Sequence, residues 1–320
     1  MNRIAIMTSG GDCPGMNACI RSATRAAISM NIKVFGIEKG YEGLINGTFI
    51  NLESKDVANT IQRGGTFLRS ARSKAFMSEE GQLEATKNLN KFEIDGLIVI
   101  GGDGSLRGAY ELFSKYTIKV IGIPGSIDND IYGTDFSLGV DTALNRIINA
   151  IDIINDTASS HDRTFLIETM GRNCGYLALM SSIAGGAEAV LIPEVPYDVK
   201  ELVDKIKKRY ESGKTRSIII VAEGASSAVE IGKQMTAAGG FDIRVTVLGH
   251  IQRGGSPTFF DRILATNMGA KAVQGLVNGA YGTMVALKNS HLEYIPLKEV
   301  INNKKDFNIE LLKLNNMLSN

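Results

Sequence analysis

The stretch Leu97-Ile98-Val99-Ile100-Gly101-Gly102-Asp103-Gly104-Ser105 decides the fold class of this chain. Its four apolar residues predict a short buried strand, and the glycine-rich loop after them leads into residues 105–116, which have helical spacing. A strand that runs through a glycine loop into a helix is typical of α/β proteins with parallel sheets.

The same order recurs along the chain. The predicted strands cover residues 4–7, 34–37, 97–100, 120–123, 165–169, 190–192 and 217–222, and the predicted helices cover residues 16–30, 79–90, 105–116, 141–155 and 198–212. This alternation predicts mostly parallel sheets covered by helices on both faces, with right-handed crossovers. Ligands bind such sheets beyond the carboxyl ends of the strands, where the glycine loops of this chain fall.

The composition narrows the class of protein. A length of 320 residues exceeds the usual size of one hydrophobic core, which predicts two domains or lobes. The formal net charge of +1 argues against nucleic acid as the main partner. The N-terminal apolar run is too short for a signal peptide, and no other run approaches membrane-spanning length, so we expect a cytoplasmic protein with no membrane contact.

The cysteines indicate packing rather than chemistry. Cys13, Cys19 and Cys174 are an odd number and lack the spacing of metal ligands. We interpret them as reduced thiols in a reducing compartment, with buried packing as the preferred role. With 3 histidines in the chain, a structural zinc site is not expected.

A second loop, Pro124-Gly125-Ser126-Ile127-Asp128-Asn129-Asp130, carries two acids two positions apart. Glycines let backbone N–H groups approach phosphate oxygens, one carboxylate can hold Mg²⁺, and another can take a proton from an attacking hydroxyl. Either this loop or Gly101–Ser105 alone would also suit an ordinary turn at a strand end. Together they predict a phosphoryl-transfer site.

A further glycine pair, Gly10-Gly11, follows the first predicted strand and precedes a predicted helix. The N–H groups of this turn and the helix end can meet phosphate anions. No Gly-Lys-Ser/Thr follows, so the pair is not a Walker P-loop, and it lacks the spaced dinucleotide fingerprint, which disfavours NAD.

These loops, within residues 8–17, 101–105 and 124–130, resemble those of bacterial ATP-dependent 6-phosphofructokinases. Residues 170–175 and 249–257 follow in the same order and are similar to the sugar-phosphate segments of that family. Only the C-terminal end matches poorly. The resemblance implies an α/β fold of two lobes, each a Rossmann-like, mostly parallel sheet covered by helices, with the active site in the cleft between them.

The resemblance also implies what each lobe does. Residues 1–138 with 251–304 would bind the nucleotide, and residues 139–250 with 305–320 would bind fructose 6-phosphate. The implied activity is phosphorylation of D-fructose 6-phosphate at O1 by ATP, which gives fructose 1,6-bisphosphate and ADP in the committed step of glycolysis. Mg²⁺ would be the cofactor, and a homotetramer would share its active sites between subunits.

On the nucleotide side, the resemblance assigns ATP binding to Gly11, Arg72, Gly102, Asp103, Gly104 and Ser105. Asp103 is expected to hold Mg²⁺, because a hard cation favours a carboxylate next to a polyphosphate. Gly104 and Gly125 favour ATP as the donor, since pyrophosphate-dependent relatives carry aspartate and lysine at these two positions.

On the acceptor side, Asp128 matches the catalytic base of the family, and Arg72, Arg172 and Ser126 complete the implied catalytic set. A dianionic sugar phosphate needs several cationic donors. The implied substrate-binding residues are Ser126, Asp128, Asp130, Arg163, Met170, Gly171, Arg172, Glu223, Arg244, His250 and Arg253. Of these, Arg163 and Arg244 are expected to reach across from a neighbouring subunit.

A weaker effector-phosphate site is implied at Arg21, Arg25, Gly186, Glu188 and Lys214. The spacing of Arg21 and Arg25 puts them on one helix face. Ser54 and Asn155 stand where well-known relatives have arginines, so we expect weak control by ADP or phosphoenolpyruvate.

Two other functions remain as alternatives. A pyrophosphate-dependent phosphofructokinase is disfavoured by Gly104 and Gly125. A catalytically silent nucleotide-binding regulator would be expected to lose Asp103 or Asp128, and both are present. An NAD or lipid kinase that shares the Gly-Gly-Asp-Gly loop leaves residues 124–130 and the arginine set unexplained.

Overall fold

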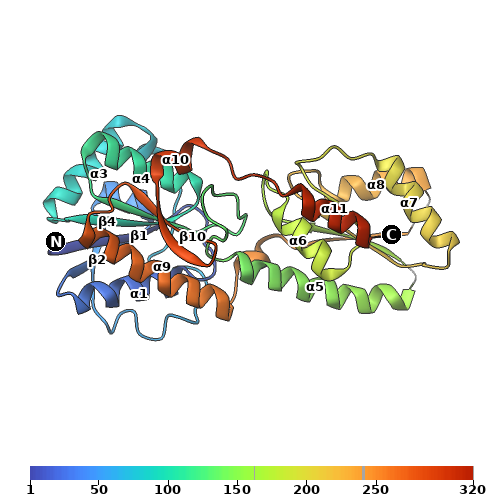
Figure 1. The fold of residues 1–320 in the computed structure, drawn as a ribbon, viewed down its shortest axis with the longest axis horizontal. Helices are drawn as coiled ribbons and strands as arrows, with labels where there is room; N and C mark the ends of the chain where they lie inside the picture. Colours follow the sequence, from blue (N-terminus) through green and yellow to red (C-terminus); the bar gives the residue numbers. More distant parts are fainter. Residues whose placement is uncertain (162, 240–241, 320) are drawn as a thin grey trace. The chain divides into compact units, whose positions relative to one another are not determined.

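The computed structural model describes residues 1–161, 163–239 and 242–319. The chain divides into two compact units, of which unit 1 comprises Met1–Thr142 and Arg253–Lys305, and unit 2 comprises Ala143–Gln252 and Asp306–Asn320. The chain therefore leaves unit 1 after Thr142, returns at Arg253, and enters unit 2 again at Asp306 (Figure 1).

Unit 1 is built on a seven-stranded sheet in the order β11-β10-β5-β4-β1-β2-β3. Its strands are β1 (Arg3–Ser9), β2 (Lys33–Ile37), β3 (Phe49–Leu52), β4 (Gly96–Gly101), β5 (Val120–Pro124), β10 (Thr283–Lys288) and β11 (His291–Pro296). Its helices are α1 (Met16–Ser29), α2 (Gly40–Asn46), the 3-10 turn η1 (Ala75–Met77), α3 (Glu79–Lys91), α4 (Asp103–Tyr116), α9 (Phe259–Asn278) and α10 (Leu297–Asn302). The inner strands are parallel, and β3 and β11 are antiparallel edge strands.

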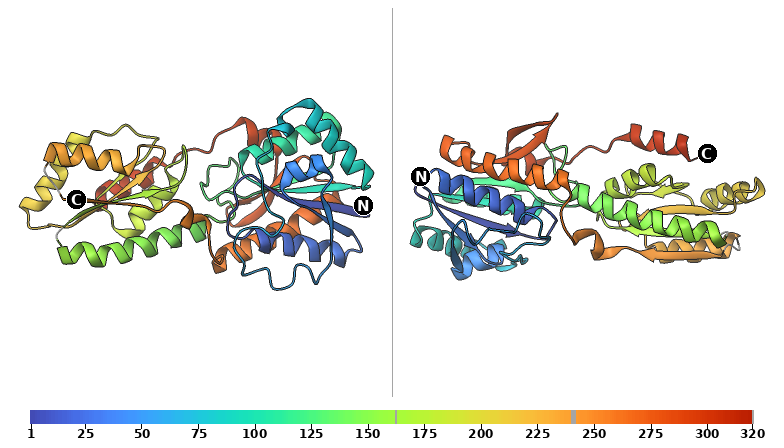
Figure 2. Two further views of the ribbon diagram at one scale, coloured as in Figure 1. Left: turned by 180° about the vertical axis from the view of Figure 1, so that it is seen from behind. Right: turned by 90° about the horizontal axis from the view of Figure 1, so that it is seen from below.

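Helices cover both faces of this sheet. On one face α1 packs against α9, and on the other α2, α3, α4 and α10 contribute to one hydrophobic core (Figures 1 and 2). Every residue of β4 and β5 is buried, which explains why both strands read as unbroken apolar runs in the sequence. The prediction of a mostly parallel α/β fold is confirmed, with antiparallel strands added at the edges.

Unit 2 has a four-stranded parallel sheet in the order β7-β8-β6-β9. Its strands are β6 (Thr164–Thr169), β7 (Ala189–Leu191), β8 (Ser217–Ala222) and β9 (Ile243–Val247). Its helices are α6 (Tyr176–Gly185), α7 (Val199–Glu211), α8 (Ala228–Gly239) and α11 (Ile309–Leu318). Helix α5 (Val140–His161) begins in unit 1 and continues into unit 2, and the 3-10 turn η2 (Gly249–Arg253) begins in unit 2 and ends at the first residue of the returning part of unit 1. One hydrophobic core joins α7 and α8 to the sheet, and α11 packs on α6.

The cysteines are free, and two of them are buried in unit 1. Cys13 follows β1 and Cys19 lies in α1, and burial raises the pKa of both thiols well above its usual value. They are therefore protonated packing residues at neutral pH. Over the described ranges 1–161, 163–239 and 242–319, no helix has both the length and the apolar character needed to cross a bilayer.

The close approach of α1 and α9 depends on Gly269. A Cβ atom at this position would lie 2.5 Å from the carbonyl oxygen of Cys19 and 3.1 Å from the backbone nitrogen of Ala23. Only a residue without a side chain lets the two helices pack at this distance.

We expect Gly269→Ala to lower the free energy of unfolding by about 1–3 kcal/mol, because the added methyl group pushes two packed helices apart. The change would otherwise stabilise α9 by roughly 1 kcal/mol through helix propensity. Urea denaturation measures the effect. Asn267→Ala, at an exposed position of the same helix, is the control and should be neutral or slightly stabilising. A gain in stability for Gly269→Ala would show that the helix pair is not tightly packed there.

Candidate active site

Three loops of unit 1 begin side by side because the strands before them are neighbours. In the parallel register, Ser9 of β1 pairs with Gly101 of β4, and Gly101 pairs with Pro124 of β5. The backbone nitrogen of Gly125 donates to the carbonyl oxygen of Gly101 at 2.9 Å. The loops that carry Gly11, Asp103 and Asp128 therefore leave the same edge of one sheet.

The loop between β4 and α4 presents backbone N–H groups at the start of a helix, an arrangement that favours anions. A Cβ atom at Gly101 would lie 2.5 Å from the carbonyl oxygen of Ser9, so packing requires this glycine. The hydroxyl of Tyr41 donates to the carbonyl oxygen of Ser105 at 2.6 Å and fixes the first turn of α4. A Cβ atom at Gly104 would meet nothing within 4 Å. The fold itself therefore does not explain the glycine at position 104.

Asp103 is the first residue of α4, and its side chain is 53% exposed. Its Oδ2 atom lies 3.9 Å from Nη2 of Arg107. Within the described residues there is no cluster of three or more His, Cys, Asp or Glu side chains that could hold a metal ion. Mg²⁺ at nucleotide sites is commonly held by one or two carboxylates together with phosphates and water. A single exposed carboxylate beside the open space at Gly104 fits that mode.

Arg72 belongs to a segment, residues 60–72, that is tied to the start of α1. The buried amide of Asn17 donates from Nδ2 to the carbonyl oxygens of Arg63 and Gly64, both at 3.1 Å, and accepts at Oδ1 from the backbone nitrogen of Phe67 at 2.9 Å. Nearer the end of the segment, the hydroxyl of Ser70 donates to the carbonyl oxygen of Gly10 at 2.5 Å. The exposed Arg72 therefore follows a segment bonded directly to the Gly10-Gly11 turn.

Asp128 lies in a compact turn and is 2% exposed. Its backbone nitrogen donates to the hydroxyl oxygen of Ser126 at 3.3 Å, and that hydroxyl donates to Oδ1 of Asp130 at 3.3 Å. Asn129 between them has φ 52°, a left-handed conformation that asparagine tolerates better than most residues. The structure thus brings together Ser126, Asp128 and Asp130, which the sequence analysis assigned to one site.

Arg253 lies beside the Gly10-Gly11 turn in unit 1. Its Nη1 atom donates to the carbonyl oxygen of Asp12 at 3.1 Å, and a Cβ atom at Gly11 would lie 2.7 Å from the same nitrogen. By resemblance, this arginine was expected to bind the sugar phosphate together with Arg163 and Arg244. In the structure it belongs to a different unit from those two residues.

In unit 2, the carboxyl ends of the strands gather one group of predicted substrate residues. Met170, Gly171 and Arg172 follow β6, Glu223 follows β8, and the exposed His250 lies in η2 after β9. The Oε1 atom of Glu223 accepts from the backbone nitrogens of Gly171 at 3.2 Å and Arg172 at 2.8 Å. The Glu223 carboxylate therefore shapes the backbone of the loop that carries Arg172.

The backbone of that loop packs closely at two glycines, Gly171 within it and Gly224 in the loop after β8. Gly171 has φ 142°, and a Cβ atom there would lie 2.3 Å from the carbonyl oxygen of Cys174. A Cβ atom at Gly224 would lie 1.7 Å from the carbonyl oxygen of Arg172. These close backbone contacts hold Arg172 in a left-handed conformation with φ 50°.

Arg163 and Arg244 lie at the opposite end of the same sheet. Arg163 precedes β6, and Arg244 is near the start of β9, where it pairs with Phe165. Both guanidinium groups contact Oδ2 of Asp242, from Nε of Arg163 at 2.9 Å and from Nη2 of Arg244 at 3.2 Å. Since β6 spans 6 residues, about 20 Å of strand separates these arginines from Met170. The structure therefore divides the predicted substrate residues of unit 2 into two groups.

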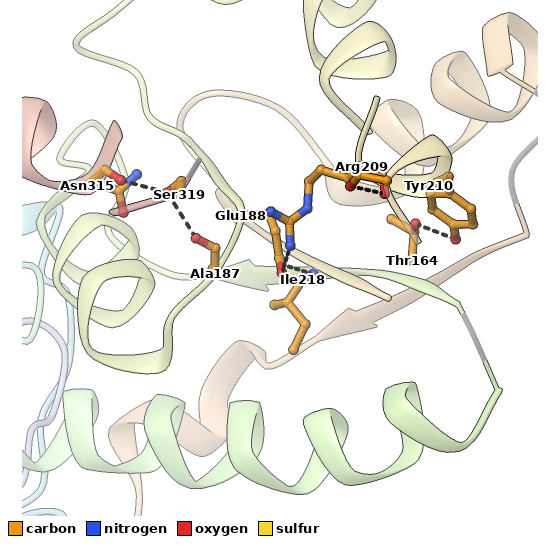
Figure 3. A network of polar contacts seen from close by, with 9 residues as sticks. Thr164, Ala187, Glu188, Arg209, Tyr210, Ile218, Asn315 and Ser319 are labelled. Atoms are coloured by element: carbon orange, nitrogen blue, oxygen red, sulfur yellow. Dashed lines mark hydrogen bonds and ion pairs between the residues drawn. The ribbon is translucent and has the colours of Figure 1, made fainter. Parts of the chain in front are cut away.

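The predicted effector residues are also divided. Arg21 and Arg25 lie on α1 in unit 1, whereas Gly186, Glu188 and Lys214 belong to unit 2. The carboxylate of Glu188 accepts from Nη2 of Arg209 at 2.7 Å and from the backbone nitrogen of Ile218 at 2.6 Å. Figure 3 shows Arg209 directed at Glu188, with Ser319 bonded to the neighbouring carbonyl oxygen of Ala187.

Sequence comparison identifies the family. A family model described as phosphofructokinase matches residues 3–276, which is most of the chain. The chain belongs to the phosphofructokinase family. The resemblance recognised in the glycine loops is thereby confirmed.

Individual phosphofructokinases agree with this assignment. The ATP-dependent 6-phosphofructokinase of Thermotoga neapolitana is 48% identical over 319 residues, and that of Listeria welshimeri is 50% identical over 319 residues, with 100% of both chains covered in each case. Among solved structures, the Pichia pastoris phosphofructokinase in the T-state matches with a TM-score of 0.90 and 39% identity, over 94% of this chain and 37% of the yeast chain. A pyrophosphate-dependent phosphofructokinase from Marinobacter aquaeolei, at 22% identity and a TM-score of 0.85, shares the fold.

Three residues that organise the site were not predicted from the sequence. Asn17 holds residues 60–72, Asp242 contacts Arg163 and Arg244, and Arg209 neutralises Glu188. Each has at least one partner that is remote in sequence. Asn17 lies within the resembling residues 8–17 but received no role there, and no motif marked Asp242 or Arg209.

Proposed function

We propose that this member of the phosphofructokinase family transfers the γ-phosphoryl group of ATP to O1 of D-fructose 6-phosphate. The products are fructose 1,6-bisphosphate and ADP, and the reaction is the committed step of glycolysis in the cytoplasm. The observation that carries the proposal is the alignment, at one edge of the unit 1 sheet, of the Gly10-Gly11 turn, the exposed Asp103 and the buried Asp128. The Thermotoga and Listeria relatives, which carry this activity in their names, support it over the full length.

The donor side uses backbone groups more than side chains. Gly11, Gly102, Gly104 and Ser105 surround the start of α4 and would bind the ATP phosphates through N–H groups and the hydroxyl. The open space beside Gly104 leaves room for a nucleotide phosphate. Asp103 would hold Mg²⁺, which when bound neutralises charge on the β- and γ-phosphate oxygens.

The acceptor chemistry centres on Asp128. As O1 of the sugar forms its bond to the γ-phosphorus and the bond to the ADP oxygen breaks, the O1 proton passes to the Asp128 carboxylate. Ser126 and Asp130 hold the turn that orients this carboxylate and would contact the substrate. Arg72 and Arg172 would stabilise the negative charge of the transferring group.

The sugar phosphate would be bound by two groups of residues. Met170, Gly171, Arg172, Glu223 and His250 lie beyond the carboxyl ends of the unit 2 strands. Arg163 and Arg244 lie at the amino ends, about 20 Å of strand away, so a single sugar phosphate could not contact both groups in one chain. We therefore propose that these two arginines complete the site of a neighbouring subunit in a homotetramer. Arg253 would contact the substrate from the Gly11 loop, where its guanidinium lies.

The preference for ATP over pyrophosphate rests on Gly104 rather than on Gly125. A Cβ atom at Gly125 would lie 3.2 Å from Cε of Met16 and 3.4 Å from Cγ2 of Ile100, so a side chain there would meet core atoms and this glycine is not an independent sign of the donor. Gly104 has no such packing reason. The catalytically silent alternative has no support, since Asp103 and Asp128 are both present at the edge of the sheet.

Effector control would be weak. Arg21, Arg25 and Lys214 supply the cationic groups, while Ser54 and Asn155 supply none. The carboxylate of Glu188 is already bonded to Arg209 and to the backbone nitrogen of Ile218, so these contacts would have to break before it could bind an effector. Only binding energy that differs between two states can shift their populations, so a site with fewer cations limits the allosteric response.

The first prediction concerns the phosphoryl donor. We expect turnover of fructose 6-phosphate with MgATP and none with pyrophosphate in a coupled assay. Gly104→Asp should raise KM for ATP about 10- to 100-fold, because its carboxylate repels the phosphates. It should leave the melting temperature unchanged, because the space is open. Gly104→Ala separates size from charge and should have the smaller effect. Comparable wild-type turnover with pyrophosphate would assign the chain to the pyrophosphate-dependent class.

The second prediction concerns the shared site. Asp128→Asn should lower kcat by roughly two to four orders of magnitude with little change in KM, because it removes the proton acceptor. Mixed with Arg163→Ala protein, it should regain activity, since hybrid tetramers contain sites with both native residues. Asp128→Asn mixed with Arg72→Ala is the control and should stay inactive, because both residues lie in unit 1 of one chain. Subunit exchange verified by mass without recovery would place all site residues in one chain.

The third prediction concerns regulation. Each missing charge-assisted hydrogen bond should cost about 1.5–3 kcal/mol of effector binding. We therefore expect millimolar phosphoenolpyruvate to displace the fructose 6-phosphate saturation curve by less than about threefold. A displacement of tenfold or more that Arg25→Ala abolishes would mean that other residues replace the missing arginines.

A further inference from the structure

Asp261 is a fully buried acid that the proposed reaction does not use. It lies in the first turn of α9, where its carboxylate accepts three hydrogen bonds. The donors are the backbone nitrogen of Gly139 at 2.9 Å, the backbone nitrogen of Thr142 at 2.8 Å and the hydroxyl of Thr142 at 2.5 Å. All of them belong to residues 134–142, which we call the strap.

The strap in turn holds the loop that carries the proposed base. The backbone nitrogen of Leu138 donates to the carbonyl oxygen of Pro124 at 2.9 Å, and the hydroxyl of Ser137 donates to the carbonyl oxygen of Ser126 at 2.8 Å. The side chain of Asn129 accepts from the backbone nitrogen of Ser137 at 3.2 Å and donates to the carbonyl oxygen of Asp135 at 3.0 Å. The strap therefore fixes Ser126 before Asp128 and Asn129 after it.

Thr142 and Asp261 also lie where two of the three segments that connect unit 1 to unit 2 meet. Thr142 is the last residue of the outgoing segment, and Thr258 lies on the returning segment shortly after Arg253. The hydroxyl of Thr258 donates to Oδ2 of Asp141 at 2.6 Å, and its backbone nitrogen donates to the hydroxyl of Thr142 at 3.0 Å. Asp261 therefore fixes the strap to the helix that follows Arg253.

Burying a carboxylate costs free energy because the charged group loses its hydration, and three hydrogen-bond donors offset only part of that cost. Burial raises the pKa of Asp261 to about 6, although its hydrogen bonds to Thr142 and Gly139 act in the opposite direction. The charged and titratable groups that face it and the adjoining Cys13 are Asp141 on the strap, Asp12 of the loop after β1, and Arg253. An acid nevertheless stands at this buried position, where it binds the strap that holds the loop of Asp128.

We propose that Asp261 is a positioning residue of the phosphoryl transfer: it holds the strap, and through the strap it sets the position of the Asp128 carboxylate. The inference rests on the proposed function. The residue touches neither substrate, and its effect should fall on the chemical step rather than on ATP binding, because the Gly10-Gly11 turn and Gly104 are held by other contacts.

The test is Asp261→Asn, which keeps the shape of the side chain but can accept at only one of its two terminal atoms. We expect kcat to fall about 10- to 100-fold, the effect of a displacement of about 1 Å at the reacting group. KM for ATP should stay within about threefold of wild type. Asp95→Asn is the matched control: that carboxylate also binds two backbone nitrogens, those of Asn2 and Arg3, but at the amino end of the sheet, and kcat should not change.

Hydrogen exchange supplies a readout that a general loss of stability would not give. In Asp261→Asn, exchange should accelerate in residues 125–142 and stay as in wild type in residues 60–72, which Asn17 holds. The ratio of wild-type to variant kcat should shrink as the pH falls through about 6, where Asp261 of the wild type becomes protonated. The ratio cancels pH effects on groups that both proteins share.

The outcomes are distinct. A folded Asp261→Asn protein with kcat within about twofold of wild type overturns the inference, as does a fall in kcat with unchanged exchange in residues 125–142. If that variant does not fold, Thr142→Val removes one hydrogen bond to Asp261, and a kcat equal to wild type overturns the inference instead. A wild-type protein that does not phosphorylate fructose 6-phosphate with ATP contradicts the proposed function, while the exchange result still tests the strap.

Discussion

The unit 1 site depends on the register between β1, β4 and β5. Ser9, Gly101 and Pro124 are paired across the three strands, so their loops begin at neighbouring-strand spacing, about 4.8 Å apart. A slip of one residue in β4 would turn its buried side chains to the other face and move Asp103 about 3.3 Å along the sheet. Because every residue of β4 is buried, such a slip would disrupt both halves of the core. The same strand pairing that buries the apolar side chains therefore also sets the positions of the candidate site loops.

The glycines at this edge of the sheet differ in how much space lies beside them. Packing explains Gly101, since a Cβ atom there would lie 2.5 Å from the carbonyl oxygen of Ser9, and a Cβ atom at Gly125 would contact Cε of Met16 at 3.2 Å. Gly104 meets nothing, so the fold leaves its identity unexplained. In the sequence the three glycines look equivalent. Only the structure shows which of them has neighbouring atoms and which does not. Gly104, with open space beside it, is therefore the one glycine of the three that bears on the choice of phosphoryl donor.

The fold could be predicted where burial leaves a local pattern. β4 and β5 are unbroken apolar runs, whereas β9 is an edge strand in which Arg244 and Thr246 interrupt the apolar residues, and it was missed. The loops of the candidate site could be predicted because their glycines and acids are contiguous. The roles of Asn17, Asp242 and Asp261 could not, since each bonds to a residue far away in the chain. Phe67 lies 50 residues from Asn17, Arg163 lies 79 from Asp242, and Thr142 lies 119 from Asp261. Their roles follow from tertiary contacts that leave no spacing in the sequence.

The ion pairs of Asp242 with Arg163 and Arg244 are weak enough for a phosphate to replace them. It holds the guanidinium groups of Arg163 and Arg244 together, and all three side chains remain substantially exposed. Exposed ion pairs contribute about 0–1 kcal/mol, because water screens them and ordering long side chains costs entropy. In the proposed function, the dianionic sugar phosphate would bind each guanidinium in a bidentate manner, which is the stronger interaction. Under that proposal, Asp242 keeps both arginines at one place until the phosphate displaces it.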